Sequence, residues 1–81
     1  MDLQAIIEID LHNMSTGEAR NRIDAALKKA GSGVYRIRCI HGYHRGTRIK
    51  SMILDEFRYE PKVIRIENGS NEGITELVLR N

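Results

Sequence analysis

Three residues that can transfer protons stand in two short polar stretches: Asp10 and His12 lie two positions apart, and His41 precedes Gly42 further along the chain. Two imidazoles beside a phosphate are suited to acid–base catalysis, because one can take a proton from water or a ribose 2′-hydroxyl while the other protonates the leaving oxygen. A carboxylate such as Asp10 can orient a histidine or hold a divalent cation such as Mg²⁺ or Mn²⁺. These residue types predict phosphodiester chemistry if the fold brings them together.

The glycine-containing segment 41–47 is suited to binding phosphate, because it leads into the start of an expected helix. The free N–H groups at a helix amino end attract anions. Arg45 and Arg48 can add charged hydrogen-bond donors there. Tyr43 can stack on a base, or remain an exposed tyrosine with no ligand.

Each candidate also has a purely structural interpretation. Asp10 can accept hydrogen bonds from turn N–H groups, and His12 can lead into the turn. His41 and Gly42 can form a strand-end turn without a ligand, and His44 can face solvent. A zinc site built from the three histidines is a further alternative, although their spacing matches no familiar zinc motif.

Hydrophobic periodicity predicts the elements that must position these residues. Strands are expected over residues 5–11, 34–40, 62–66 and 74–79. A first helix is expected over about residues 16–30, opening with a Ser-Thr-Gly-Glu capping box and ending at Gly31 in a left-handed conformation. A second helix is expected over about residues 47–58, and Pro61 prevents it from continuing. The order β-α-β-α-β-β predicts a two-layer α/β sandwich (an α+β fold), with a mixed four-stranded sheet and both helices on one face.

The first two strands should be parallel, because a helix connects them in a right-handed crossover. Ligands bind at the carboxyl ends of such strands, so Asp10, His12 and His41 are expected to meet at one edge of the sheet. The third strand should also run parallel, and the fourth antiparallel. The fourth strand could lie at a sheet edge and pair with another copy, so we expect a monomer or a weak homodimer.

The bulk composition is that of one soluble domain spanning residues 1–81. No apolar run approaches the ~18 residues of a membrane helix. Residues 1–4 show no basic region leading into an apolar stretch, so we expect no secretory signal. A single cysteine, Cys39, in an apolar run is expected to fill the core and fits the cytoplasm. The net charge of +2 does not itself identify a nucleic-acid binder. Basic residues do gather around the central glycines: Arg36, Arg38, Arg45, Arg48 and Lys50.

Two motifs resemble those of Smr (small MutS-related) domains. Residues 9–12, Ile-Asp-Leu-His, resemble the Leu-Asp-Leu-His signature that opens these domains, and residues 41–47 resemble their central His-Gly-x-Gly-x-Gly loop. The resemblance covers about residues 5–80. It implies a fold like the C-terminal domain of the third bacterial translation initiation factor, and it implies nucleic-acid binding. Several members are endonucleases: some nick or resolve branched DNA, and others cut messenger RNA on stalled ribosomes.

By this resemblance, Asp10 and His12 are the candidate catalytic pair, to which the acid–base argument adds His41. The candidate nucleic-acid contacts follow His41 in the chain: Gly42, Tyr43, His44, Arg45, Gly46, Thr47 and Arg48. His44 replaces the second glycine of the family loop, where a side chain can crowd a phosphate or supply another polar group. We expect an endonuclease acting on structured DNA or on RNA. The alternative is a binding module without catalysis, and a protein adaptor or a small-molecule enzyme is less favoured.

Overall fold

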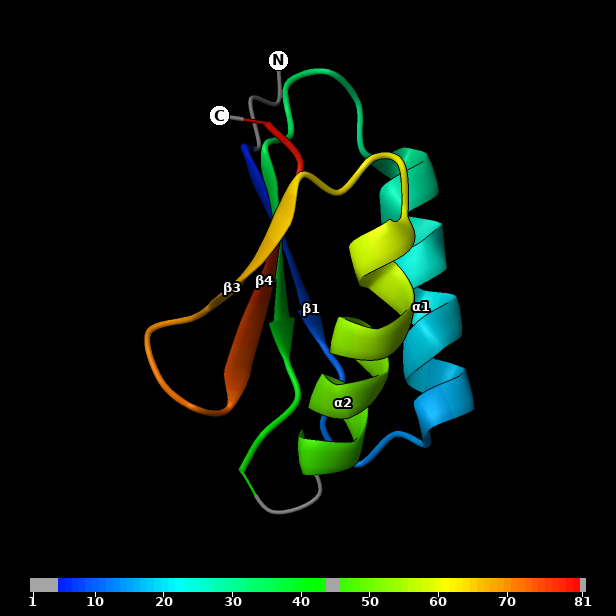
Figure 1. Ribbon diagram of the computed structural model, residues 1–81, viewed down its shortest axis with the longest axis vertical. Helices are drawn as coiled ribbons and strands as arrows, with labels where there is room; N and C mark the ends of the chain where they lie inside the picture. The colour runs from blue at the N-terminus through cyan, green and yellow to red at the C-terminus, as the bar shows by residue number, and fades with distance from the viewer. Residues whose placement is uncertain (1–4, 44–45, 81) are drawn as a thin grey trace.

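The computed structural model describes residues 5–43 and 46–80. The elements follow the predicted β-α-β-α-β-β order, with a short 3₁₀ turn after the second helix (Figure 1). Their bounds are β1 (Ile6–Asp10), α1 (Thr16–Lys29), β2 (Arg36–Ile40), α2 (Gly46–Glu56), the 3₁₀ turn (Phe57–Tyr59), β3 (Arg65–Asn68) and β4 (Ile74–Val78). In the described part of the chain, no helix combines the length and the apolar character needed to cross a bilayer.

The sheet has the strand order β1-β2-β4-β3, and both helices lie on one of its faces (Figure 1). The first two strands are parallel, as predicted, with Asp10 paired to Ile40 at their carboxyl ends. β4 is antiparallel to β2 and to β3, so β3 runs in the predicted direction but has no parallel neighbour. The prediction that the fourth strand lies at an edge is wrong, because β4 pairs on both sides and β1 and β3 form the edges.

Helix α1 begins with the predicted capping box. The Glu18 amide donates to Ser15 Oγ at 3.1 Å, and the Ser15 amide donates to the Glu18 carboxylate at 3.0 Å. Its end differs from the prediction: Ala30 caps the helix in an extended conformation (φ −66°, ψ 111°), and Gly31 is not left-handed. Lys62 Nζ instead binds the carbonyl of Leu27 at 2.8 Å. A side chain from the segment before β3 thus satisfies a carbonyl that a left-handed glycine cap would otherwise satisfy.

The core lies between the helices and the sheet, because alternate strand residues face α1 and α2. Its fully or nearly fully buried aliphatic side chains come from strands and helices alike: Leu11, Ile37, Leu77, Ile23, Leu27, Ile49 and Ile53. Each such side chain contributes about 1.5–3 kcal/mol. Cys39 is also buried here as a free thiol, as predicted. This one-sided core holds the carboxyl ends of β1 and β2 in fixed positions.

The opposite face of the sheet carries a row of alternating charges. Each member forms an ion pair with the next, beginning on β1 and ending on β3: Glu8, Arg38, Glu76, Arg36, Glu67 and Arg65. Glu76 lies at the centre with its side chain only 8% exposed, and it accepts hydrogen bonds from Arg36 and, at 2.7 Å, from Arg38. Burial raises the pKa of Glu76, but these hydrogen bonds outweigh it and lower the pKa overall. Arg36 and Arg38 therefore neutralise carboxylates within the sheet and do not add charge to the glycine loop.

Candidate active site

Asp10 and His12 form a hydrogen-bonded pair at the carboxyl end of β1. Leu11 between them is fully buried, and its amide donates to the carbonyl of Ile40 at 2.8 Å. Because side chains alternate along an extended chain, Asp10 and His12 share the opposite side. His12 Nδ1 contacts Asp10 Oδ1, which also accepts the His12 amide at 3.1 Å. The sequence prediction that Asp10 and His12 meet at one edge of the sheet is confirmed.

The geometry of this pair is suited to proton transfer. The hydrogen bond from the His12 side chain is the main cause that lowers the pKa of Asp10, followed by the one from the His12 amide. An ionised carboxylate only accepts hydrogen bonds, so Nδ1 must carry the proton and Nε2 of a neutral ring keeps its lone pair. Within residues 5–43 and 46–80, Nε2 has no hydrogen-bond partner. Both side chains are well exposed, at 60% for His12 and 58% for Asp10.

His41 occupies a different environment, because its side chain is buried among the helix-facing residues and only 3% of the residue is exposed. Its Nε2 lies 2.8 Å from Thr75 Oγ1, and its Nδ1 lies 3.0 Å from the carbonyl oxygen of Gly42. A carbonyl only accepts, so Nδ1 donates and Nε2 accepts from the threonine hydroxyl. Burial is the main cause that lowers the pKa of His41. The backbone of His41 reaches the predicted edge, but its imidazole points into the core.

The start of the glycine loop is anchored to the start of β4. The amides of His41 and Gly42 both donate to the carbonyl of Gly73, at 2.9 and 3.0 Å. Gly42 has φ +85°, a left-handed conformation that favours glycine, and a Cβ built on it would lie 3.9 Å from His12 Cβ. Gly42 therefore lies beside the His12 side chain. The Gly42 N–H already donates to the Gly73 carbonyl, so it cannot bind a phosphate.

Sequence reasoning missed Gly73 and Thr75. Thr75 alternates along the strand with the apolar residues Leu77 and Leu79, and a polar residue in that series was the available signal. It also missed Arg22, an exposed α1 residue whose charge helps to lower the pKa of Asp10.

The remaining predicted contacts surround the start of α2. Tyr43 is 60% exposed, and Thr47 and Arg48 are exposed in the first turn of the helix. Arg48 forms no ion pair within the described residues. Gly46 begins the helix, whereas His44 and Arg45 lie outside the described residues. The first-turn N–H groups and Arg48 can together bind an anion near His12.

The zinc alternative finds no support among the described residues, where no group of three or more His, Cys, Asp or Glu side chains is arranged to hold a metal. The two described histidines have different partners: His12 binds Asp10, and His41 binds Thr75. Asp10 Oδ2 has no partner in the described part of the chain, so that oxygen can ligate a divalent cation.

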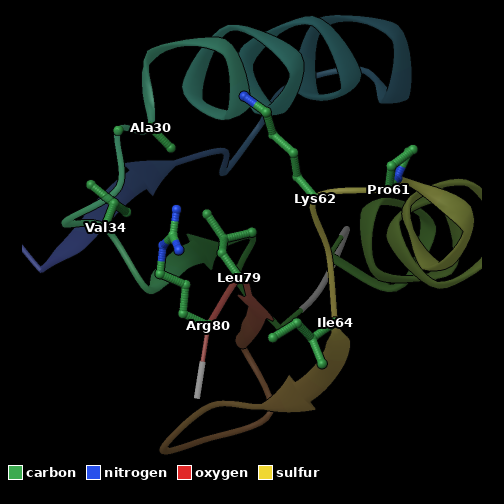
Figure 2. A pocket seen from close by; sticks show the side chains of 8 residues that line it. Ala30, Val34, Pro61, Lys62, Ile64, Leu79 and Arg80 are labelled. Atoms are coloured by element: carbon green, nitrogen blue, oxygen red, sulfur yellow. The ribbon is translucent and has the colours of Figure 1, made fainter.

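A separate small pocket of about 220 Å³ lies at the other end of the sheet, between the end of α1 and the start of β3. Figure 2 shows Lys62 extending toward α1, while Arg80 lies beside Val34 and Leu79. The Lys62 ammonium group binds the Leu27 carbonyl, as described above. We therefore interpret this pocket as part of the helix-end packing, remote from Asp10.

Two comparisons with known proteins agree with this arrangement. The Smr domain family model matches residues 9–78. The crystal structure of the Smr domain of Thermus thermophilus MutS2 is similar, with a TM-score of 0.81 and 26% sequence identity over 93% of this chain and 99% of that chain. The curated proteins contain no match. The segment that the family model matches includes both motifs, the end of β1 and the other three strands, and the chain belongs to the Smr domain family.

Proposed function

We propose that this Smr domain is an endonuclease that cleaves phosphodiester bonds in structured DNA or in RNA. Smr domains in general bind nucleic acids, and the family includes endonucleases. The observation that carries the proposal is the exposed Asp10–His12 pair, whose imidazole Nε2 is free among the described residues. Gly42 lies beside His12, and the first turn of α2 supplies anion-binding groups.

In the proposed reaction His12 is the general base. Nε2 takes a proton from the attacking water, or from a ribose 2′-hydroxyl if the substrate is RNA. Asp10 holds the ring in the tautomer that makes this possible and stabilises the imidazolium that forms. Arg48 and the amides of the first α2 turn bind the phosphate, and solvent protonates the leaving oxygen because the site is open.

His41 acts as a positioning residue in this proposal. Its imidazole is buried and bonded on both nitrogens, so it reaches neither water nor phosphate. It fixes the carbonyl of Gly42, and with it the backbone beside His12. This role replaces the catalytic role that the sequence alone suggested for His41.

The test is a cleavage assay on labelled single-stranded RNA, duplex DNA and branched DNA, each with Mg²⁺, Mn²⁺ or EDTA. The native chain is compared with a double variant, Asp10→Ala with His12→Ala, whose fold is confirmed by circular dichroism. Cleavage by the native chain alone supports the proposal, and its behaviour in EDTA decides whether a cation at Asp10 is required. Equal cleavage by both proteins, or none by either, contradicts it.

A recognition module without catalysis is the second candidate, and the burial of His41 favours it because only one described imidazole faces the solvent. Such a module would bind nucleic acid through phosphate contacts, and its affinity would fall steeply with salt. If salt-sensitive binding occurs without cleavage, His44→Gly is the first substitution to make, because it restores the family glycine.

We also propose that the domain works in the cytoplasm. Cys39 is a free, buried thiol, and burial raises its pKa to about 12, so it is unreactive and has no disulfide partner in the chain. This supports a reducing compartment.

A further inference from the structure

A polar hollow lies between the amino ends of α1 and α2, and its lining begins at Asn13, the residue after His12. Residues 13–16 and Glu18 line one side, and Thr47 and Arg48 line the other. The open space measures about 940 Å³, within the range of roughly 300–1,000 Å³ that small-molecule sites occupy. Asn13 directly follows His12, so the hollow is connected to the Asp10–His12 pair by the backbone.

The polar side chains of the hollow divide into two sets. Ser15 and Glu18 are engaged with each other in the capping box. The others make no hydrogen bond or ion pair through their side chains within the part of the chain that the structure describes: Asn13, Thr16, Thr47 and Arg48. Several unengaged donors and acceptors therefore line one concavity, as a ligand site requires.

The chemistry of these groups matches one nucleotide. The Arg48 guanidinium can bind a phosphate through two hydrogen bonds. The Asn13 amide and the two threonine hydroxyls can each donate to and accept from a base or a sugar. Met14 is half-buried and packs on the core, so it offers an adaptable apolar surface for a base.

A neighbouring charge-balanced groove along α2 shares Thr16, Thr47 and Arg48 with the hollow. There Arg20 is held by Glu56 in a two-pronged ion pair at 2.6 and 2.8 Å, and Asp55 also lines the wall. Because the two arginines and two acids that line this groove balance each other, it offers a second phosphate no net attraction. The site is therefore suited to a single nucleotide unit at its open end.

We propose that this hollow binds one unpaired nucleotide next to the phosphate at His12; this inference rests on the proposed nucleic-acid function. A paired base is stacked inside a duplex and would have to be flipped out to enter. The substrate class that follows is single-stranded RNA or DNA, or the unpaired nucleotides at a junction, rather than uninterrupted duplex.

The test is an NMR titration of the ¹⁵N-labelled chain with AMP, with inorganic phosphate as the comparison. We expect saturable shifts of the backbone amides of residues 13–18 and 47–48 with AMP, and smaller ones with phosphate. Arg48→Gln should weaken AMP binding about tenfold, since hydrogen bonds to charged groups are among the stronger ones. Asn13→Gly should also weaken it, while glycine tolerates the left-handed backbone at this position (φ 64°).

Lys29→Gln is the matched control, because it removes the same charge from the exposed last turn of α1. Unchanged AMP binding in this variant supports the hollow. Equal weakening in Lys29→Gln and Arg48→Gln, AMP shifts centred elsewhere, or shifts that phosphate alone reproduces would each overturn the proposal.

Failure of this inference is distinguishable from failure of the proposed endonuclease. If the chain cleaves nucleic acid in a His12-dependent way but AMP does not bind between α1 and α2, the nucleotide site is wrong and the nuclease stands. If AMP binds there and no substrate is cleaved, the nucleotide site stands without the nuclease. For an active enzyme, faster cleavage of a blunt duplex than of a single strand would also contradict the hollow.

Discussion

The imidazole of His41 and the hydroxyl of Thr75 are joined by a 2.8 Å hydrogen bond in the interior, beneath the carboxyl edge of the sheet. The bond connects the end of β2 with β4, and the same imidazole binds the carbonyl of Gly42 on its other side. Through this chain of contacts, a residue distant in sequence controls the backbone beside His12.

Thr75→Val should destabilise the fold by about 1–3 kcal/mol, because it keeps the side-chain shape but leaves buried His41 Nε2 without its donor. Urea denaturation of both proteins measures the difference. Thr47→Val is the control, since Thr47 is exposed and its loss should change stability by less than about 0.5 kcal/mol. Equal stability of the Thr75 variant and the native chain would show that the bond contributes nothing.

Stability should fall as the pH drops below about 6.5, the ordinary pKa of histidine. The pKa of His41 in the fold is lowered by burial, so between the folded and unfolded values the unfolded chain binds the extra proton. The contribution of His41 is complete above that window and is lost on acidification. His41→Gln should flatten this part of the pH profile in urea titrations. If the His41→Gln variant has the same stability–pH profile as the native chain, the loss of stability in acid comes from other groups.

Asp10→Asn should reduce cleavage at least about a hundredfold while leaving nucleic-acid binding nearly unchanged, because an amide no longer holds His12 in the required tautomer. Single-turnover cleavage and a separate binding titration provide the two readouts. Asp24→Asn, on α1, is the matched control. Parallel losses of binding and cleavage would place Asp10 in substrate binding instead.

Gly42→Ala should cost about 1–3 kcal/mol, because alanine is strained at φ +85°. It should also lower cleavage, since relief of this strain would shift the backbone beside His12. Gly33→Ala is a suitable control: Gly33 has no atom within 4 Å of a built Cβ and no left-handed φ. Similar effects of both substitutions in thermal denaturation would contradict a special role for Gly42.

Glu76→Gln should destabilise the fold by about 1–3 kcal/mol, because two arginines lose the charge of a nearly buried partner. Glu8→Gln, at the exposed end of the same row, should have little effect. Guanidinium chloride would screen these pairs, so urea is the denaturant of choice. A larger loss from Glu8→Gln than from Glu76→Gln would contradict this account.

The sequence predicts local features of the site well and long-range ones poorly. The side-chain alternation at Asp10 and His12 and the capping box at Ser15 depend on neighbouring residues, and the structure confirms both. The burial of His41 depends on Thr75, which comes from a strand whose place between β2 and β3 no local pattern reveals. For the same reason the pairing of Arg36 with carboxylates on β3 and β4 was not predicted. The catalytic roles, and the function of residues 1–81 as one independent domain, stay predictions.

The paired charges across the open sheet face leave the two sides of this small protein electrostatically different. Within the row, three arginines are matched by three glutamates, so their fields largely cancel within a few ångströms of the surface. Arg22 and Arg48 lack such a carboxylate partner among the described ion pairs, and they flank the edge where β1 ends. A polyanion that approaches the domain would therefore meet balanced charge on the sheet and unpaired guanidinium groups at this edge.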